Sequence, residues 1–332
     1  MERKTLKKIE SVFSEALEKI EEQLLSQADL HGMTLDGLLS DFNNRDQKKY
    51  RDYVDKNYKK LMQSDEKYQE FIDEFFPAYD YAKVNRLMQI RADIFSTLAS
   101  ETIDADLNGR FNSGLEDIVN RTYNSNSNAL MQLVVSGDFS PLSQSELQKM
   151  LNYPWSGKTF SNRLWGNISK LEQNLSQSIV NAVQSGEGVE EALRTMRNDE
   201  GISDMFKQEK DKFNRAIENL VRTEYAHFAV EGIEKSYKDA GIEKYRNYSA
   251  EDERVCSTCG AMHGKVFKVS EGVAGVTKPV WHTKCRCTTT PVMKDLPEDI
   301  DEIYEEMFGD TLDEFAKEQF GIKLNHPKKN RS

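Results

Sequence analysis

The chain of 332 residues lacks the features that would place it in or across a membrane. It contains no run of about 18 apolar residues, the length that a membrane-spanning helix requires. Its first five residues include charges and are not followed by an apolar core, so no secretory signal is expected. The protein is therefore expected to mature in a reducing cytoplasm.

Several enzyme motifs are also missing. The sequence has no Gly-x-x-x-x-Gly-Lys and no Gly-x-Gly-x-x-Gly, so neither a phosphate-binding loop nor a dinucleotide-binding turn is expected. It has no His-x-Glu, which zinc-dependent base deaminases use, and no His-Glu-x-x-His, which marks a helix-borne zinc protease. Hydrophobic residues make up 38% and charged residues 30% of the chain, which favours an elongated, helix-rich protein over a compact enzyme. We expect no enzymatic activity.

The net charge of −11 is concentrated near the end of the chain. Residues 295–320 contain 11 acidic residues and one lysine, so the remainder is close to neutral. The protein as a whole is therefore not a polycation of the kind that binds nucleic acid through overall charge. Residues 294–332 are interpreted as a solvated, acidic helical tail with a basic terminus.

Apolar residues at helical spacing predict a mainly α fold. Residues 1–150 are expected to form an elongated, helical N-terminal region, with long exposed helices over 41–75 and a further helix over 78–98. The polar run 124–128 is the clearest break, although a helix through it is also possible. The apolar stripe of the first predicted helix consists of Leu6, Ile9, Phe13, Leu17, Ile20 and Leu24.

A helical core domain is predicted over 151–293. In its first helix apolar residues recur at steps of three or four, and a short helix over 189–196 and a long one over 213–237 follow. Glu224 falls in the middle of the apolar stripe of the long helix, where a carboxylate is costly without a partner. A structural pairing is favoured, and a catalytic role is the alternative. The stripe of the first helix consists of Phe160, Leu164, Ile168, Leu171, Leu175, Ile179 and Ala182.

The pattern of residues changes after Gly241, from long helical periodicity to short segments. Segments 244–249, 265–269 and 287–292 are short and rich in residues that favour strands, and glycines separate them. Residues 244–292 are therefore predicted to form a small α+β module, a zinc-knuckle-like unit packed on the preceding helices.

Cysteine is scarce, and all four cysteines lie in this module within 32 consecutive positions. Cys256-x-x-Cys259 is followed by His282-x-x-Cys285-x-Cys287, so two close pairs of metal-binding side chains are joined by a loop. In a reducing compartment such a cluster favours metal over disulfides. Four protein ligands would fill a tetrahedral zinc site, which favours a structural over a catalytic ion. The alternative is a module without metal, whose cysteines are buried or oxidise later.

The choice of ligands depends on the conformation near Cys287. On a regular strand Cys285 and Cys287 would point to opposite faces, so both could not easily bind one metal. The first choice is therefore Cys256, Cys259, His282 and Cys285, with Cys287 facing the core. The runner-up replaces His282 with Cys287 and needs an irregular turn at Arg286. His263 is a third candidate, more compatible with a surface or hydrogen-bonding role.

Five segments of the sequence resemble a known family. Residues 252–259 (DERVCSTC), 263–267 (HGKVF) and 279–287 (PVWHTKCRC) resemble the C-terminal signature of the phage Mu F-like minor head proteins, a phage head morphogenesis family. Residues 155–161 (WSGKTFS) resemble the entry to the first core helix of that family, and 222–224 (RTE) the motif of the second. The resemblance covers about 150–292. The usual proline pair before the histidine is reduced here to Pro279-Val280-Trp281.

The resemblance implies a function that composition does not. It implies a minor capsid protein of a tailed bacteriophage, present in the host cytoplasm during assembly and then in the virion. It also implies action at the portal vertex during procapsid assembly, with the portal protein as partner and the scaffold or major capsid protein as further candidates. Some members leave the head with the DNA. The family pattern carries over to Cys256, Cys259, His263, His282, Cys285, Cys287, Arg222 and Glu224. From the place of Glu224 on the apolar stripe, we hypothesise that it pairs with Arg254 or Arg286 and ties the long helix to the module.

Two other functions are alternatives to this one. A nucleic-acid-binding virion protein that protects or guides the injected genome would need a basic face, and most basic residues here are interleaved with acidic ones. A zinc hydrolase or nuclease would need Glu224 or His263 in a catalytic role. The order of preference is head protein, nucleic-acid-binding protein and hydrolase.

Overall fold

The computed structural model describes residues 2–31, 48, 52, 55, 56, 86–133, 137–184, 204–249 and 254–293. The chain divides into two compact units that interleave along the sequence. The first unit comprises 1–6, 109–160 and 218–332, and the second comprises 7–108 and 161–217. The predictions over 41–75, 189–196 and 294–332 lie outside the described residues, apart from four isolated positions. The predicted division near residues 150 and 293 stays a prediction.

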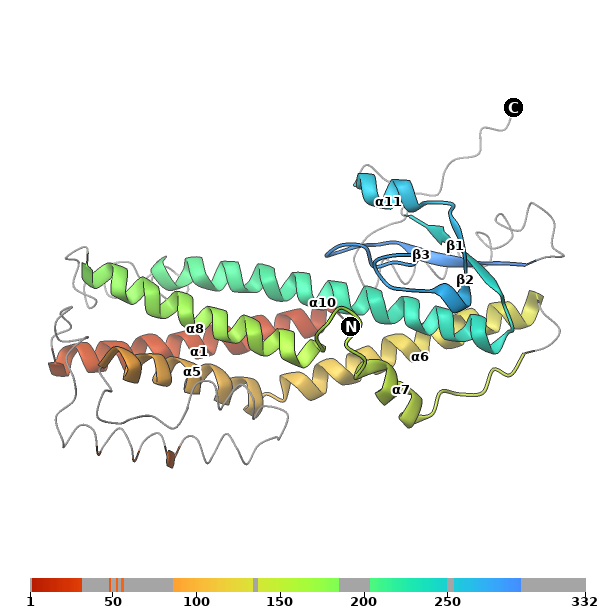
Figure 1. Ribbon diagram of the computed structural model, residues 1–332. Helices are drawn as coiled ribbons and strands as arrows, with labels where there is room; N and C mark the ends of the chain where they lie inside the picture. The colour runs from red at the N-terminus through yellow and green to blue at the C-terminus, as the bar shows by residue number, and fades with distance from the viewer. Residues whose placement is uncertain are drawn as a thin grey trace. The chain divides into compact units, whose positions relative to one another are not determined.

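Long helices dominate the described residues, as predicted (Figure 1). In the second unit, α1 (Glu2–His31), α5 (Arg86–Asp104), α8 (Phe160–Gln184) and the first part of α10 (Asp204–Asp239) contribute to the core. The Phe13 and Phe213 rings lie 4.4 Å apart, and the Phe95 and Trp165 rings 6.4 Å apart. The apolar stripes predicted from helical spacing are buried: Leu6, Ile9, Phe13, Leu17, Ile20 and Leu24 on α1, and Phe160, Leu164, Ile168, Leu171, Leu175, Ile179 and Ala182 on α8.

The polar run 124–128 is not a break, because α6 (Leu107–Leu133) continues through it. Asn126 is buried and its Nδ2 donates to the Ser236 hydroxyl of α10 at 2.5 Å. Nearby, a methyl group added at Gly232 of α10 would lie 2.6 Å from the Val119 carbonyl oxygen. The two helices therefore pack closely, with small and polar residues in the contact.

A short helix and a turn lead from α6 to α8. Helix α7 (Gln144–Leu151) begins with a capping box, in which the Ser143 side chain accepts from the Glu146 backbone N–H and Glu146 accepts from the Ser143 N–H. After α7, Trp155 stands next to Gly157, whose φ of +87° suits a residue without a Cβ. This turn brings Trp155 against α10 in the first unit.

A small antiparallel sheet follows α10, as predicted. Its strands are β1 (Lys244–Tyr248), β2 (Val266–Lys268) and β3 (Thr288–Val292), in the order β2-β1-β3. Between β1 and β2 lies the short helix α11 (Ser257–Met262), and the 3-10 turn η3 (Val269–Glu271) follows β2. The sheet packs on the end of α10, where the Tyr237 hydroxyl donates to the Thr289 carbonyl at 2.8 Å. The module is thus fixed to the helix that precedes it.

In the part of the chain that the structure describes, no helix combines the length and the apolar character that crossing a bilayer needs.

Candidate metal centre

The first arm of the site is the start of α11. Cys256 is the N-cap of this helix, and its Sγ accepts from the Cys259 backbone N–H at 3.4 Å. Cys259 lies in the first turn and is 4% exposed. Because only two residues separate the cysteines, both sulfur atoms lie on the same side of this turn, as the sequence predicts for a metal-binding knuckle.

The second arm is the turn that leads into β3. The Cys285 N–H donates to the His282 carbonyl at 3.2 Å, and Lys284 has a φ of +58°. The Lys284 N–H also donates to the Thr223 hydroxyl of α10 at 3.1 Å. Thr223 is the central residue of the Arg222-Thr223-Glu224 segment, so this segment holds the second arm directly through a hydrogen bond.

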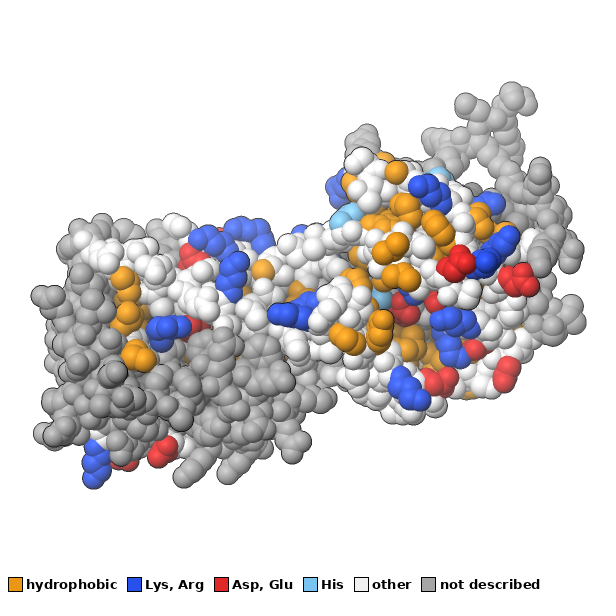
Figure 2. All heavy atoms as spheres, in the orientation of Figure 1, with side chains coloured by type: hydrophobic (Ala, Val, Ile, Leu, Met, Phe, Trp, Pro, Cys, Tyr) orange, Lys and Arg blue, Asp and Glu red, His pale blue; other side chains and the backbone are white. Residues whose placement is uncertain are grey.

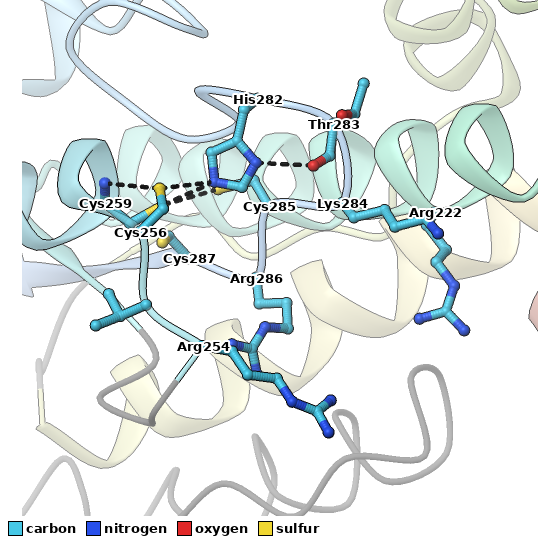
Figure 3. A pocket seen from close by; sticks show the side chains of 11 residues that line it. Arg222, Arg254, Cys256, Cys259, His282, Thr283, Lys284, Cys285, Arg286 and Cys287 are labelled. Atoms are coloured by element: carbon cyan, nitrogen blue, oxygen red, sulfur yellow. Dashed lines mark hydrogen bonds between the residues drawn. The ribbon is translucent and has the colours of Figure 1, made fainter. Parts of the chain in front are cut away.

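His282 bridges the two arms (Figure 3). Its Nε2 lies 3.3 Å from Cys256 Sγ and 3.0 Å from Cys259 Sγ. Its Nδ1 lies 2.7 Å from the Thr283 carbonyl oxygen, which can only accept. Nδ1 therefore carries the proton, and the Nε2 lone pair faces the thiols. A second hydrogen bond of this kind commonly orients a metal-binding histidine.

Cys285 and Cys287 also converge on Cys259. The three sulfur atoms lie within 4.8 Å of one another, and the Cys259 and Cys285 sulfurs are 3.9 Å apart. This differs from the strand alternation assumed in the prediction, because β3 begins only at Thr288 and 285–287 are not strand. Cys287 is buried, as expected, but it faces the cluster. Each of the two groups of neighbouring ligand atoms thus contains three residues of one predicted set, with Cys259 in both groups, and the choice between the sets stays open.

His263 has a different role in the geometry. It is the C-cap of α11, and its Nδ1 accepts from the Ser249 N–H at 3.2 Å. Among the described residues it is in neither of the two groups able to hold a metal. This agrees with the hydrogen-bonding role that the sequence favours for it.

The cysteine thiols of the cluster differ in pKa. A hydrogen bond from the Cys287 thiol lowers the pKa of Cys285 to about 5, although burial opposes this. Burial raises the pKa of Cys259 to about 12, and the contact with Cys285 together with burial raises the pKa of Cys287. A preformed thiolate at Cys285 suits a cation, and metal binding at the other thiols would release protons.

His282 and Cys256 form the more exposed side of the cluster. Burial lowers the pKa of His282, but the Thr283 carbonyl and the neighbouring thiolates outweigh burial and raise it overall. The Cys259 backbone N–H lowers the pKa of Cys256. Acidification would therefore place a proton on His282 in competition with a metal.

The donor set fits zinc. Sulfur and imidazole nitrogen are the ligands that structural zinc prefers, and two thiolates of a tetrahedral site lie about 3.8 Å apart for Zn–S bonds of about 2.3 Å. The 3.9 Å between the Cys259 and Cys285 sulfurs matches this spacing. A zinc ion there would hold both arms together, with Cys256, Cys259 and Cys285 joined by either His282 or Cys287.

Glu224 is buried beside the site. It is 1% exposed, and its Oε2 accepts from the Trp155 indole N–H at 3.2 Å. The Trp155 ring stacks on His227 at 4.1 Å, while Arg222 pairs with Glu218 at 3.0 Å. Two of the segments singled out in the sequence therefore meet here, and sequence reasoning missed this contact. The tie to Arg254 or Arg286 stays a hypothesis.

A buried lysine fixes the loop between η3 and the second arm. Lys278 is 5% exposed, and its Nζ contacts Glu234 and lies 2.6 Å from Glu231, both on α10. Burial lowers the pKa of Lys278, but the two carboxylates outweigh burial and raise it overall. The sequence does not predict this contact, because a lysine in a glycine-rich loop is usually a surface residue.

Comparison with known proteins identifies one family. The model of the family described as Phage Mu protein F like protein matches residues 173–290. The match includes the second half of α8, all of α10 and the whole Cys/His cluster. No curated protein and no solved structure matches the chain.

Proposed function

We propose, from the membership of residues 173–290 in the Phage Mu protein F like family, that the chain is a head protein of a tailed bacteriophage that acts in head morphogenesis. The family match is the observation that carries this function. It ends at residue 290, so it includes both arms of the metal centre and the α10 face that supports them. The proposed role is structural, in the virion and in its assembly.

The finer proposal places the protein at the portal vertex during procapsid assembly. Its partners would be the portal protein and, as further candidates, the scaffold or major capsid protein. The sheet-bearing part exposes apolar side chains that suit docking: Val255, Val266, Val273 and Val276 are 41–65% exposed. Figure 2 shows hydrophobic side chains gathered on one face of that part, with charged side chains around them. Release with the DNA is a further part of the proposal.

The metal is proposed to be structural zinc. With four protein ligands bound, no coordination position remains for a water that could attack a substrate. The residues would act by holding the two arms of the module in one geometry, and an enzymatic role is not proposed. Glu224 is proposed to support the module through Trp155 and not to take part in chemistry.

The test is recovery of the tagged chain from infected cells. We expect it to co-sediment with procapsids and to co-purify with the portal protein in low copy number. The control is a Cys256→Ser variant measured for metal content as well as assembly. Absence of the wild-type chain from procapsids and virions would refute the head-protein proposal. Wild-type protein free of zinc, with unfolding unchanged by a chelator, would refute the zinc proposal alone.

A further inference from the structure

A pocket of about 280 Å³ opens at the Cys/His cluster, within the first unit, and all five side chains of the cluster form part of its lining. Its described lining includes four basic side chains and no carboxylate. Figure 3 shows these cations grouped below and to one side of the thiols. The four cations are Arg222, Arg254, Lys284 and Arg286.

A carboxylate near the pocket pairs with two of these cations. Glu218 lies 3.0 Å from both Arg222 and Lys284, so one carboxylate is shared between two cations. A zinc ion with three thiolates and an imidazole carries a charge of −1, and with four thiolates −2. The described lining itself contributes four cations and no carboxylate to set against these negative charges.

The cations come from three segments, namely the two arms of the Cys/His cluster and α10. Arg254 precedes Cys256 by two residues, and Arg286 lies between Cys285 and Cys287. Arg222 adjoins Thr223, whose hydroxyl receives the Lys284 N–H. Because the backbone is held at these positions, less conformational entropy is lost when the basic side chains bind a ligand.

We propose that this pocket binds the phosphodiester backbone of a nucleic acid. Arginine presents paired N–H donors that match two oxygens of a phosphate. The volume is just below the range for drug-sized ligand pockets, about 300–1,000 Å³, which suits a phosphate with its sugar better than a larger ligand. Such contacts position a nucleic acid without reading its sequence. DNA as the source of the phosphate rests on the proposed function, because a head protein shares its compartment with the packaged genome.

The test is binding of the purified, zinc-loaded full chain to a short labelled oligonucleotide, single-stranded and as a duplex, over a range of salt concentrations. The pocket variant is Arg254→Gln/Arg286→Gln, and the matched control is Lys265→Gln/Lys268→Gln, which removes two exposed charges of the same module outside the pocket. Loss of two phosphate contacts should lower the slope of log affinity against log salt by about 1.8 for the duplex and about 1.4 for the single strand. It should weaken binding by about tenfold per contact at about 50 mM salt. The control should bind as the wild type does.

Metal content is measured for every variant. If the double variant loses zinc, Arg222→Gln replaces it, because Arg222 lies on α10 away from the ligands, and its slope should fall by about 0.9 for the duplex. Equal binding by the pocket and control variants would overturn the proposal. So would displacement of the oligonucleotide by inorganic phosphate at an equal concentration of phosphate groups, which would assign the pocket to free phosphate. Binding through the pocket by a chain absent from phage heads would refute the head-protein proposal alone.

Discussion

The second unit and the Cys/His module are stabilised by different interactions. In the second unit, long helices bury continuous apolar stripes, and rings such as Phe95 and Trp165 fill the space between them. In the module, the described residues of 244–292 form one helix of six residues, one short 3-10 turn and three short strands. Its buried residues include three cysteines and a lysine. The helical unit obtains its stability from apolar burial, whereas the module combines little apolar area with polar contacts and a Cys/His cluster that could hold a metal.

This difference follows from the length of the helices and strands in each region. A helix of 25 residues such as α8 presents about seven turns, so its stripe buries enough surface to fold without a cofactor. Small modules with few apolar residues gain their folding free energy from bound metal or cross-links. The comparison predicts that a substitution in the module changes the metal content, whereas a substitution in the second unit changes the free energy of unfolding without changing the metal content.

The largest effect is expected at Cys259, which belongs to both metal-binding groups. Cys259→Ser should abolish stoichiometric zinc binding and unfold the module, because zinc contributes on the order of 10 kcal/mol in small zinc-dependent folds. Metal analysis and tryptophan fluorescence measure the two losses. Ser257→Ala, on the same turn, is the control. Full metal content in the Cys259 variant would contradict a centre built on this residue.

The same measurement on His282→Asn and Cys287→Ser separates the two ligand sets. The variant that retains one zinc per chain identifies the side chain that the metal does not need.

A smaller effect is expected at Trp165, which is fully buried in the second unit. Trp165→Ala should lower the free energy of unfolding by about 3–5 kcal/mol through lost burial and a cavity. Zinc content should not change. Thermal unfolding followed by circular dichroism, with exposed Lys170→Ala as the control, measures this. Loss of zinc in the Trp165 variant would show that the two regions are not independent.

Lys278 tests the polar contribution to the module. Lys278→Met should destabilise it by about 3 kcal/mol, because it leaves the buried carboxylate of Glu234 without this cation. The control is Lys268→Met, at an exposed lysine paired with Glu271. Chemical denaturation of the zinc-loaded protein gives both values, and equal stabilities would mean that the lysine pair adds nothing.

The smallest effect is expected at Thr223. Thr223→Val keeps the shape of the side chain but removes the acceptor for the Lys284 N–H, at a cost of about 1 kcal/mol. Thr223→Ser retains the hydroxyl and should bind zinc with unchanged affinity. A competition titration with a chelator would detect the difference, and identical affinities in Val and Ser variants would exclude Thr223 as an anchor of the second arm.

The apolar periodicity of α1 and α8 was predictable because one face of each helix meets the core along its whole length. The Cys/His cluster was also predictable, since its close spacing suits one metal. The sequence left the continuation of α6 through 124–128 open, because Asn126 has its partner Ser236 110 positions later in the chain. The convergence of Cys285 and Cys287 depends on where β3 begins, which a two-residue alternation cannot locate. The partner of Glu224, Trp155, is likewise 69 positions away.

The face of α10 that carries Thr223, His227, Glu231 and Glu234 repeats at steps of four, four and three residues. One inserted residue would rotate every later position by about 100° around the helix axis. Thr223 would then still hold the second arm, while Glu231 and Glu234 would turn away from Lys278. The spacing of these contacts along α10 is therefore fixed, so an insertion or deletion between residues 223 and 234 should not be tolerated.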